Sequence, residues 1–217
     1  MKRFTIALLV AVVGAVGHHQ ALAQTMNSYS AYPPFINKSV PPAVMLMMTK
    51  DHRLFFKGYN DIVDLDNGKP GGDAAVDTTY KDNIDYVGYF DSKKCYDYSS
   101  SGPAGFANTG RFNPAVAGTG AYGHYCTAKW SGNFLNWATM ARIDIIRRVL
   151  YGGKRIRDDA GTSTVPMSGN NGLTVLGRTT TPRDAHSWAK PYAGADLASL
   201  VPTAALGIGA AVTICNT

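Results

Sequence analysis

The chain has 217 residues, of which 45% are hydrophobic and 17% charged, and its formal net charge is +6. This balance supports a folded core and excludes a wholly disordered chain, while the length allows one sizeable domain or two small ones. The basic residues form no run with interleaved aromatic side chains, so we expect no nucleic-acid partner.

Residues 1–23 have the pattern of a signal peptide. The basic stretch Met1–Phe4 precedes the apolar run Thr5–Gly17, and Ala21–Ala23 fits the small-x-small pattern of a cleavage site. The apolar run is short for a membrane span, so we expect membrane attachment only through an uncleaved signal peptide. The sequence therefore predicts an exported protein.

The chain has three cysteines, Cys95, Cys126 and Cys215. In an oxidising compartment they are disulfide candidates first. Cys95 and Cys126 flank one loop rich in Gly and Ser, and a bridge between them would stabilise the fold by about 3–4 kcal/mol in the chain-entropy model. Cys215 is left over, either as a free thiol or as a partner for a cysteine outside this chain, and the odd count suggests a piece of something longer.

Several elements are expected in chain order. Residues 24–42 are polar and rich in proline, which predicts an extended N-terminal segment. The apolar run Ala43–Met48 predicts a buried strand, with the first turns of a buried helix as the alternative. Residues 51–131 have only short apolar runs among Gly, Asp, Asn, Ser and Tyr, and predict a long irregular insertion closed by the disulfide.

The clearest periodic segment is Asn133–Gly153, which predicts one amphipathic helix packed on a sheet and ended by its two glycines. A helix lying on a membrane surface is the alternative. Beyond it, Thr174–Thr179 is a possible strand and Pro182–Tyr192 a short helical turn with Asp184 near its start. The final Ala211–Cys215 predicts a strand of a domain cut within its sheet.

Five stretches of the chain together resemble the PilC/PilY family of type IV pilus assembly and tip-adhesin proteins, most of all the branch common in delta-proteobacteria. They are "YNDIVDLD", "IDYVGYFDSKKCYDY", "CTAKWSGNFLNW", "FLNWATMARIDIIRRVLYGG" and "PRDAHSWAK". Members of this family are much longer, with a von Willebrand A-like domain in the N-terminal region and a C-terminal β-propeller that bears a calcium site. The resemblance covers the chain from about residue 40 onward, without the propeller.

The resemblance implies an α/β fold in which residues 43–217 form a partial von Willebrand A-like domain, truncated at its C-terminus in the sense that its last strand ends with the chain. Residues 51–131 would be the insertion between its first strand and first helix. The adhesive version of that fold carries a DxSxS metal motif after the first strand. Here the equivalent place reads "MMTKDHRL", where only Thr49 and Asp51 offer oxygen ligands and Lys50 lies between them, so we expect no intact metal site there.

The loop Tyr59–Asp77 is the candidate calcium site. It contains Asp61, Asp64, Asp66, Asp73 and Asp77, and carboxylates on a turn rich in glycine are what calcium requires. The loop is not an EF-hand, because "DLDNG" is one residue short of the pattern and Ala75 stands where the terminal Glu belongs. The alternative is a solvated turn without an ion.

A weaker metal candidate would combine Asp51 and His52 with Asp184 and His186, if the fold brings the two pairs together. A histidine that is buried and hydrogen-bonded for structural reasons is the alternative to a ligand.

No motif of a hydrolase, metalloprotease or nucleotide-binding enzyme is present, so we expect no enzymatic activity. The resemblance implies an exported interaction protein of the type IV pilus system, located in the periplasm, outer membrane or at the pilus tip. Its partners would be pilins, other assembly proteins or a host or surface ligand, with Ca²⁺ as a possible cofactor. The alternative is an exported calcium- or carbohydrate-binding module unrelated to pili, in which four tyrosines would either stack on sugars or pack beneath the insertion: Tyr86, Tyr89, Tyr96 and Tyr98.

Overall fold

The computed structural model describes Met45, Met47, Thr49 and residues 51–100, 110–158, 174–180 and 187–216. The chain divides after residue 48 into two compact units, and the fold described below belongs to the second, residues 49–217. The predicted signal peptide 1–23, the extended segment 24–42 and the pair Asp184 and His186 lie outside the described residues.

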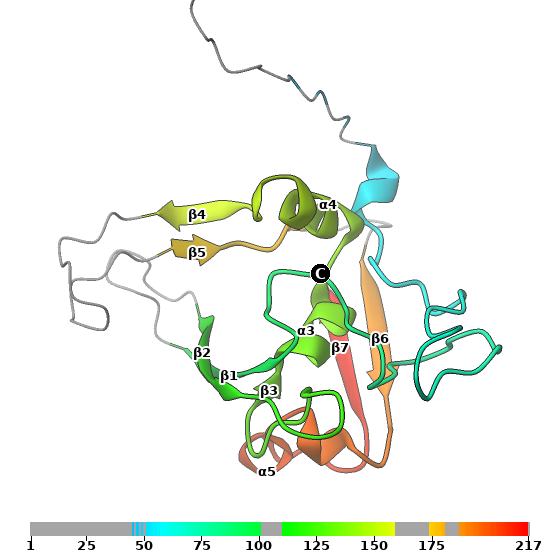
Figure 1. Ribbon diagram of the computed structural model, residues 1–217. Helices are drawn as coiled ribbons and strands as arrows, with labels where there is room; N and C mark the ends of the chain where they lie inside the picture. Colours follow the sequence, from blue (N-terminus) through cyan, green and yellow to red (C-terminus); the bar gives the residue numbers. More distant parts are fainter. Residues whose placement is uncertain are drawn as a thin grey trace, which may run out of the picture. The chain divides into compact units, whose positions relative to one another are not determined.

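The second unit combines short helices with small antiparallel sheets (Figure 1). The helical elements are η1 (His52–Phe55), α3 (Gly132–Thr139), α4 (Arg142–Tyr151), η2 (Leu197–Ser199) and α5 (Thr203–Leu206). The first sheet has the order β2-β1-β3, made of β1 (Lys94–Ser99), β2 (Arg111–Ala117) and β3 (Trp130–Ser131). Two hairpins complete the set, β4 (Arg155–Asp158) with β5 (Thr174–Leu176) and β6 (Trp188–Tyr192) with β7 (Val212–Asn216).

The predicted disulfide is present between Cys95 on β1 and Cys126 in the segment before β3, with a Cα–Cα distance of 5.6 Å. Both cysteines are buried. The bridge therefore holds the central strand of the first sheet to the segment that leads into β3 and α3. Cys215 lies in β7 opposite Ala189 and forms no disulfide with the other two cysteines.

The single helix predicted over Asn133–Gly153 is wrong, because the segment forms two helices that meet at Met140 and Ala141. Both residues have extended backbone, with ψ of 131° and 159°. The backbone groups released at this break are paired with the segment after η1. Gly58 N donates to Met140 O at 2.8 Å, and Arg142 N donates to Phe56 O at 3.1 Å. Gly152 does end α4 in the left-handed region, as predicted.

The two helices are buried to different extents. Every residue of α3 from Gly132 to Ala138 is buried, so this helix is enclosed rather than amphipathic. In α4 the described burial is limited to Ile143 and Asp144, while Val149 is 70% exposed. The apolar stripe predicted to continue along the whole segment thus contributes to the core mainly through α3.

Two polar residues of α3 hold the irregular segment that precedes β1. Asn133 accepts a hydrogen bond from Tyr86 N and donates to Ile84 O, both at 2.8 Å. Asn136 accepts from Phe90 N at 3.0 Å and donates to Tyr86 O at 2.8 Å. These amides take the place of a neighbouring strand, which is why a segment with no regular structure can be buried here.

The hydrophobic core surrounds α3, which lies near the centre of the described fold (Figure 1). Phe134 and Trp137 of α3 pack against rings from distant parts of the chain, Tyr80 before β1 and Tyr192 in β6. Each large side chain buried in this way stabilises the fold by about 1.5–3 kcal/mol. The core therefore joins the start, the middle and the end of the second unit.

Two other predictions are wrong where the structure describes them. Met45 and Met47 are 84% and 83% exposed and belong to no strand, although a buried strand was predicted over residues 43–48. Trp188–Tyr192 is strand β6 rather than part of a helical turn, because β7 pairs with it along its whole length. The predicted strand at the end of the chain is confirmed as β7, and the one after residue 173 as the short β5.

The fold class is confirmed as a mixed α/β domain with a disulfide. The von Willebrand A-like architecture is not confirmed, since all strand pairs among the described residues are antiparallel and belong to sheets of two or three strands. The described part of residues 51–131 is indeed largely irregular, apart from η1 and the strands of the first sheet.

Candidate functional site

We call residues 63–77 the acidic loop, because an isolated β-bridge between Val63 and Asp77 closes it. The turn between these ends uses two glycines in the left-handed region, Gly68 and Gly71, with φ of 75° and 76°. This closure brings Asp64, Asp66 and Asp77 together, with one carboxylate oxygen of each lying within 4.8 Å of the others. Three of the five predicted calcium ligands therefore form one cluster.

Two carboxylates of the cluster are fully enclosed, since Asp66 is 0% and Asp77 1% exposed. Asp66 accepts hydrogen bonds from Asn83 Nδ2 at 3.0 Å and from Asp73 N at 3.3 Å. The Asn83 hydrogen bond is the main reason that the pKa of Asp66 lies below its ordinary value. Asp77 accepts from Leu65 N at 2.6 Å through Oδ2, while its Oδ1 is buried, accepts no hydrogen bond and lies 3.4 Å from Lys81 Nζ.

Lys81 is the cation that faces this cluster. Its Nζ lies 3.5 Å from Asp66, 3.2 Å from Asp73 and 3.4 Å from Asp77. The hydrogen bond to Asp73 leads the interactions that raise the pKa of Lys81 above its ordinary value. One ammonium thus faces three carboxylates directly, and Asp64 adds a fourth negative charge nearby, so the site carries a surplus of negative charge.

The remaining two predicted ligands lie outside the cluster. Asp73 is at its solvent side, with a side chain that is 57% exposed. Asp61 has left-handed backbone (φ 57°) and points toward the core, where it accepts a hydrogen bond from Trp137 Nε1 at 2.8 Å. The structure therefore separates Asp61 from the acidic loop.

Asp61 is instead the partner of a buried lysine. Lys190 on β6 is 1% exposed, and its Nζ lies 3.1 Å from Asp61 Oδ2 and 4.1 Å from the centre of the Trp137 ring. Burial lowers the pKa of Lys190 to about 8, and the nearby Asp61 carboxylate opposes that shift. This pair joins the segment after η1 to the last hairpin across the helix α3.

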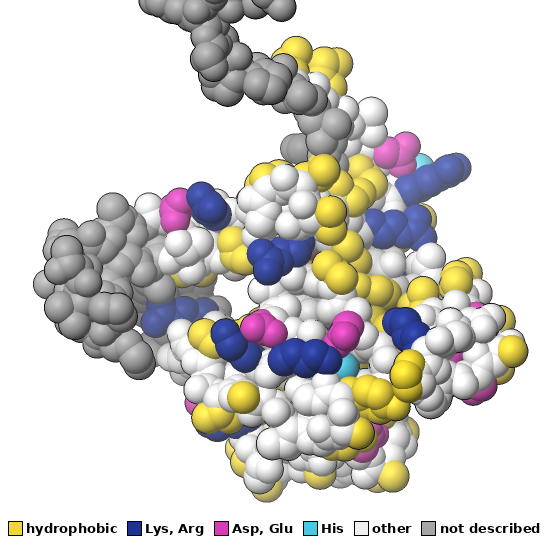
Figure 2. Space-filling view, in the orientation of Figure 1, with side chains coloured by type: hydrophobic (Ala, Val, Ile, Leu, Met, Phe, Trp, Pro, Cys, Tyr) yellow, Lys and Arg dark blue, Asp and Glu magenta, His cyan; other side chains and the backbone are white. Residues whose placement is uncertain are grey.

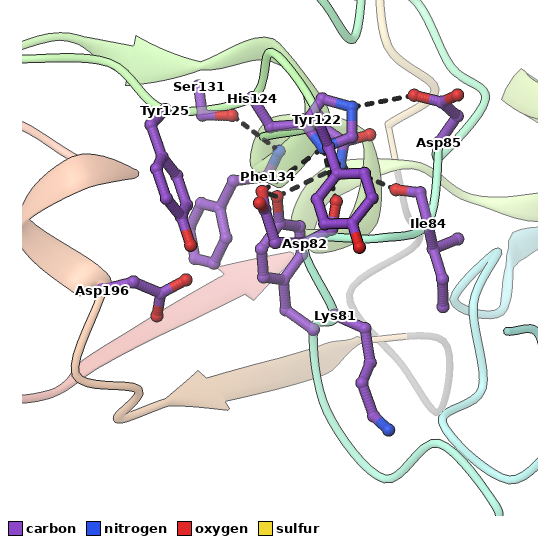
Figure 3. Close-up of polar contacts among 12 residues, drawn as sticks. Lys81, Asp82, Ile84, Asp85, Tyr122, His124, Tyr125, Ser131, Phe134 and Asp196 are labelled. Carbon is purple, nitrogen blue, oxygen red and sulfur yellow. Dashed lines mark hydrogen bonds and ion pairs between the residues drawn. The ribbon is translucent and has the colours of Figure 1, made fainter. Parts of the chain in front are cut away.

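A second polar network surrounds His124 (Figure 3). Its Nδ1 lies 2.7 Å from Asp82 O, and its Nε2 lies 2.8 Å from Asp85 Oδ1. Each ring nitrogen therefore has an acceptor, which suits the protonated imidazolium, while the Lys93 ammonium 3.1 Å from Nε2 opposes it. Burial lowers the pKa of His124, but the hydrogen bonds to Asp82 and Asp85 outweigh burial and raise the pKa above its ordinary value.

The His124 network is linked to both the core and the surface. Asn133 Nδ2 lies 3.1 Å from His124 Nδ1, and Lys93 Nζ lies 2.7 Å from Asp85. Lys81, which follows the acidic loop, points away from this network in Figure 3. Basic and acidic side chains alternate across the middle of the face seen in Figure 2, with a histidine beside them. The network therefore supports the fold and is separate from the acidic loop.

The weaker metal candidate is tested only in part. Asp51 and His52 lie side by side at 3.6 Å, and both side chains are more than half exposed. Their predicted partners Asp184 and His186 lie outside the described residues. Of the tyrosines considered as sugar platforms, Tyr86 and Tyr96 are buried at 3% and 8% exposure, whereas Tyr98 is 55% exposed.

Several residues that organise these sites carry no signal in the sequence. Asn133 lies inside an apolar pattern, and Lys81 and Lys190 look like ordinary surface cations. Asp144 is fully buried and lies 3.9 Å from Arg147 of its own helix, but it also accepts hydrogen bonds from the distant Thr179, from N at 3.0 Å and from Oγ1 at 2.7 Å. Their partners are distant in sequence, so a local pattern could not identify them.

Comparison with known families decides what kind of protein this is. Residues 77–217 match the family described as "PilY1 homolog, small alpha/beta domain". The chain belongs to the PilY1 homolog family. This result confirms the predicted family, and the match begins at Asp77, the last residue of the acidic loop.

Two relatives of this PilY1-family chain come from Xylella fastidiosa (strain Temecula1), and each is named "Type IV pilus biogenesis factor PilY1 homolog". The first is 39% identical over 171 residues, which is 76% of this chain and 10% of the relative. The second is 43% identical over 91 residues, 40% of this chain and 7% of the relative. The chain therefore spans about a tenth of the length of these relatives.

No solved structure matches the PilY1-family chain. Within the described ranges, no helix combines the length and the apolar character needed to cross a membrane.

Proposed function

We propose that this chain is an exported interaction protein of the type IV pilus system, acting in pilus assembly, tip adhesion or surface attachment. The observation that carries the proposal is the match of residues 77–217 to the PilY1 homolog family, together with relatives named as pilus biogenesis factors. Its partners would be pilins or other pilus assembly proteins, or a host or surface ligand. It would act outside the cytoplasm, in the periplasm or at the cell surface.

The role we propose is binding rather than catalysis. Two buried charged groups are paired, Lys190 with Asp61 and His124 with the exposed Asp85. Such pairing fixes a surface in one shape, which favours recognition of a partner. The von Willebrand A-like architecture, which would assign this surface to an adhesion domain, stays a prediction from the resemblance.

A genetic test separates this role from that of an unrelated binding module. Deletion of the gene should abolish or reduce piliation, and the chain should coelute with pilins from sheared surface fractions. The Cys95→Ala/Cys126→Ala variant should restore piliation less well than the parent, whereas Lys129→Gln, a surface change, should restore it fully. Normal piliation in the deletion strain, together with binding on a glycan array, would favour the carbohydrate-binding alternative.

We also propose that the acidic loop binds Ca²⁺ and that the ion competes with Lys81. The residues fit a cation, since Asp64, Asp66 and Asp77 bring oxygens within 4.8 Å of one another and the buried Asp77 Oδ1 is faced only by the Lys81 ammonium, at 3.4 Å, among the described residues. Calcium prefers clustered carboxylate oxygens on a flexible turn. An ion held there would fix the two ends of the loop to each other.

Calorimetric titration with CaCl₂ tests this proposal. The parent should release or absorb heat, the Asp64→Ala/Asp66→Ala double variant should not, and Lys81→Met should bind the ion more tightly because a competing cation is gone. Asp85→Ala, an acidic residue outside the loop, is the matched control and should bind like the parent. Identical heat traces for the parent and the double variant would exclude the site.

A further inference from the structure

A cavity of about 530 Å³ lies between the first sheet and the β4–β5 hairpin. Its wall includes Gly110–Pro114, which is the start of β2 with the residue before it, and Thr174–Arg178, which is β5 with the two residues after it. Tyr89 and Met140 also line the cavity. In Figure 1, β2 is the strand of the first sheet drawn nearest the β4–β5 hairpin, and β5 is the hairpin strand on the side of β2. The cavity is separate from the acidic loop and from His124.

The two strands present their edges to the cavity. Side chains of a strand alternate between its two faces, so a run of consecutive lining residues means that the strand borders the cavity with its edge. Both β2 and β5 have such runs. In the described sheets β2 pairs only with β1, and β5 pairs only with β4, so each has one edge without a neighbouring strand. Backbone groups at such edges can pair with an added strand.

The charged side chains in the described wall are all basic. Among the described lining residues there are two arginines, Arg111 and Arg178, and no acidic residue. The Nε and Nη1 atoms of Arg111 are buried and have no hydrogen-bond partner. Buried guanidinium nitrogens without an acceptor are unfavourable, and a carboxylate is the group that matches the guanidinium geometry.

Arg178 is a second cation in the wall, and it uses only some of its hydrogen-bond donors within the described residues. Its Nη1 donates to Asn216 Oδ1 and, at 3.5 Å, to Thr139 O. Burial lowers the pKa of the Arg178 guanidinium, and Asp144 opposes this only in part. The rest of the wall is apolar and aromatic, with Phe112, Ile156 and Leu176 among its residues. An occupant therefore needs a negative group beside an apolar one.

We propose that this cavity binds an extended peptide segment of a partner protein, with a carboxylate placed on Arg111 and an apolar side chain inside the cavity. The segment would pair through its backbone with β2 or β5, as strands added to a sheet edge do. The free edges favour a peptide over a small organic acid, which could not use their backbone groups. This inference deepens the proposed interaction role by giving the chemistry of the partner, and rests on that role only for the partner being a pilus protein.

Selection of phage-displayed random heptapeptides on the full-length chain tests the inference without knowledge of the partner. The selected peptides should share Asp or Glu beside an apolar residue. A synthetic copy of the most enriched peptide should lose about tenfold or more in affinity for Arg111→Gln, because a charge-assisted bidentate contact is lost. Backbone N-methylation of the peptide should also weaken binding, because it removes donors needed for strand pairing.

Arg155→Gln is the matched control, since Arg155 is another strand arginine, lies outside the cavity and is exposed at its side chain. It should leave peptide affinity unchanged, and Arg111→Lys should retain part of the affinity. Circular dichroism of each variant checks that it folds.

No enrichment, enriched peptides without an acidic residue, or equal binding to Arg111→Gln and the parent would each overturn the inference. Equally tight binding of 3-phenylpropionate and the peptide would overturn the peptide part of it. If the peptide binds the purified chain as expected but deletion of the gene leaves piliation normal, only the proposed pilus role is contradicted. A piliation defect with no enriched peptide would contradict only this inference.

Discussion

Asp66 and Asp77 in the acidic loop share the single cation Lys81, whereas Asp61 and Asp144 near the core have partners of their own. All four are held by hydrogen bonds from the protein, but only the loop has more carboxylates than cations around it. The aspartates compared here therefore have two different roles. Those around α3 fix the fold, while those in the loop carry more negative charge than Lys81 balances.

The largest expected effect concerns the disulfide, which belongs to the structural region and not to the loop. Replacement of both cysteines, Cys95→Ala/Cys126→Ala, should lower the free energy of unfolding by about 3–4 kcal/mol, because the unfolded chain regains the freedom that the bridge removed. Urea denaturation of the two proteins measures this difference. A mass spectrum of the exported parent with both cysteines as free thiols would contradict the premise.

The next effect tests whether the core aspartates are structural. Asp61→Asn keeps the side-chain size and tolerates the left-handed backbone, but leaves the buried Lys190 ammonium without its carboxylate. We expect a loss of about 2–3 kcal/mol in unfolding free energy. The double variant Asp61→Asn/Lys190→Met should recover much of the loss, since the buried charge is removed as well. Failure of the second change to recover stability would show that the pair is not coupled.

The pH dependence of stability tests the His124 network. Since the pKa of His124 is higher in the folded than in the unfolded protein, its stabilisation is complete below the unfolded value of about 6.5 and is lost as pH rises through the folded value. We expect the unfolding free energy to fall over that range, by about 1.4 kcal/mol for each pKa unit of the difference. The His124→Gln variant should show a flatter profile in denaturation measured from pH 5 to about 9. Equal slopes for both proteins would exclude His124 as the cause.

The smallest effect belongs to the loop. Asp73→Asn removes an exposed partner of Lys81 and should change the unfolding free energy by about 0.5 kcal/mol or less in the absence of calcium. Thermal melts in a chelator measure it. A loss as large as that of Asp61→Asn would mean that the loop is as structural as the core and would remove the contrast between the two regions.

The features that the sequence predicted correctly depend on local patterns. A glycine after a periodic apolar segment predicted the helix end that the structure has at Gly152. Two cysteines around one loop predicted the disulfide that the structure contains. Five aspartates on a glycine-rich turn predicted a carboxylate cluster, and three of them form one: Asp64, Asp66 and Asp77. Each of these depends on residue types that act over a short range or have one dominant partner.

The errors have a common cause in long-range contacts. The apolar periodicity runs through Met140 and Ala141, but the helix is interrupted there because residues 56–58, far away in sequence, supply backbone hydrogen-bond partners. Trp188–Tyr192 is a strand because β7 pairs with it. Asp61 faces Lys190, 129 residues later, rather than its neighbours in the loop. No periodicity contains such information.

By itself, the sequence determined the family, the disulfide and the position of the acidic loop, because idiosyncratic motifs, cysteines and clustered aspartates are visible residue by residue. Only the tertiary structure decided which aspartates pair with buried cations, that two asparagines of α3 support an irregular segment, and that two strand edges with Arg111 border one cavity. Hydrogen bonds and ion pairs between distant residues depend on the packed arrangement of the whole domain, and the free energy that selects them is shared among all of its contacts.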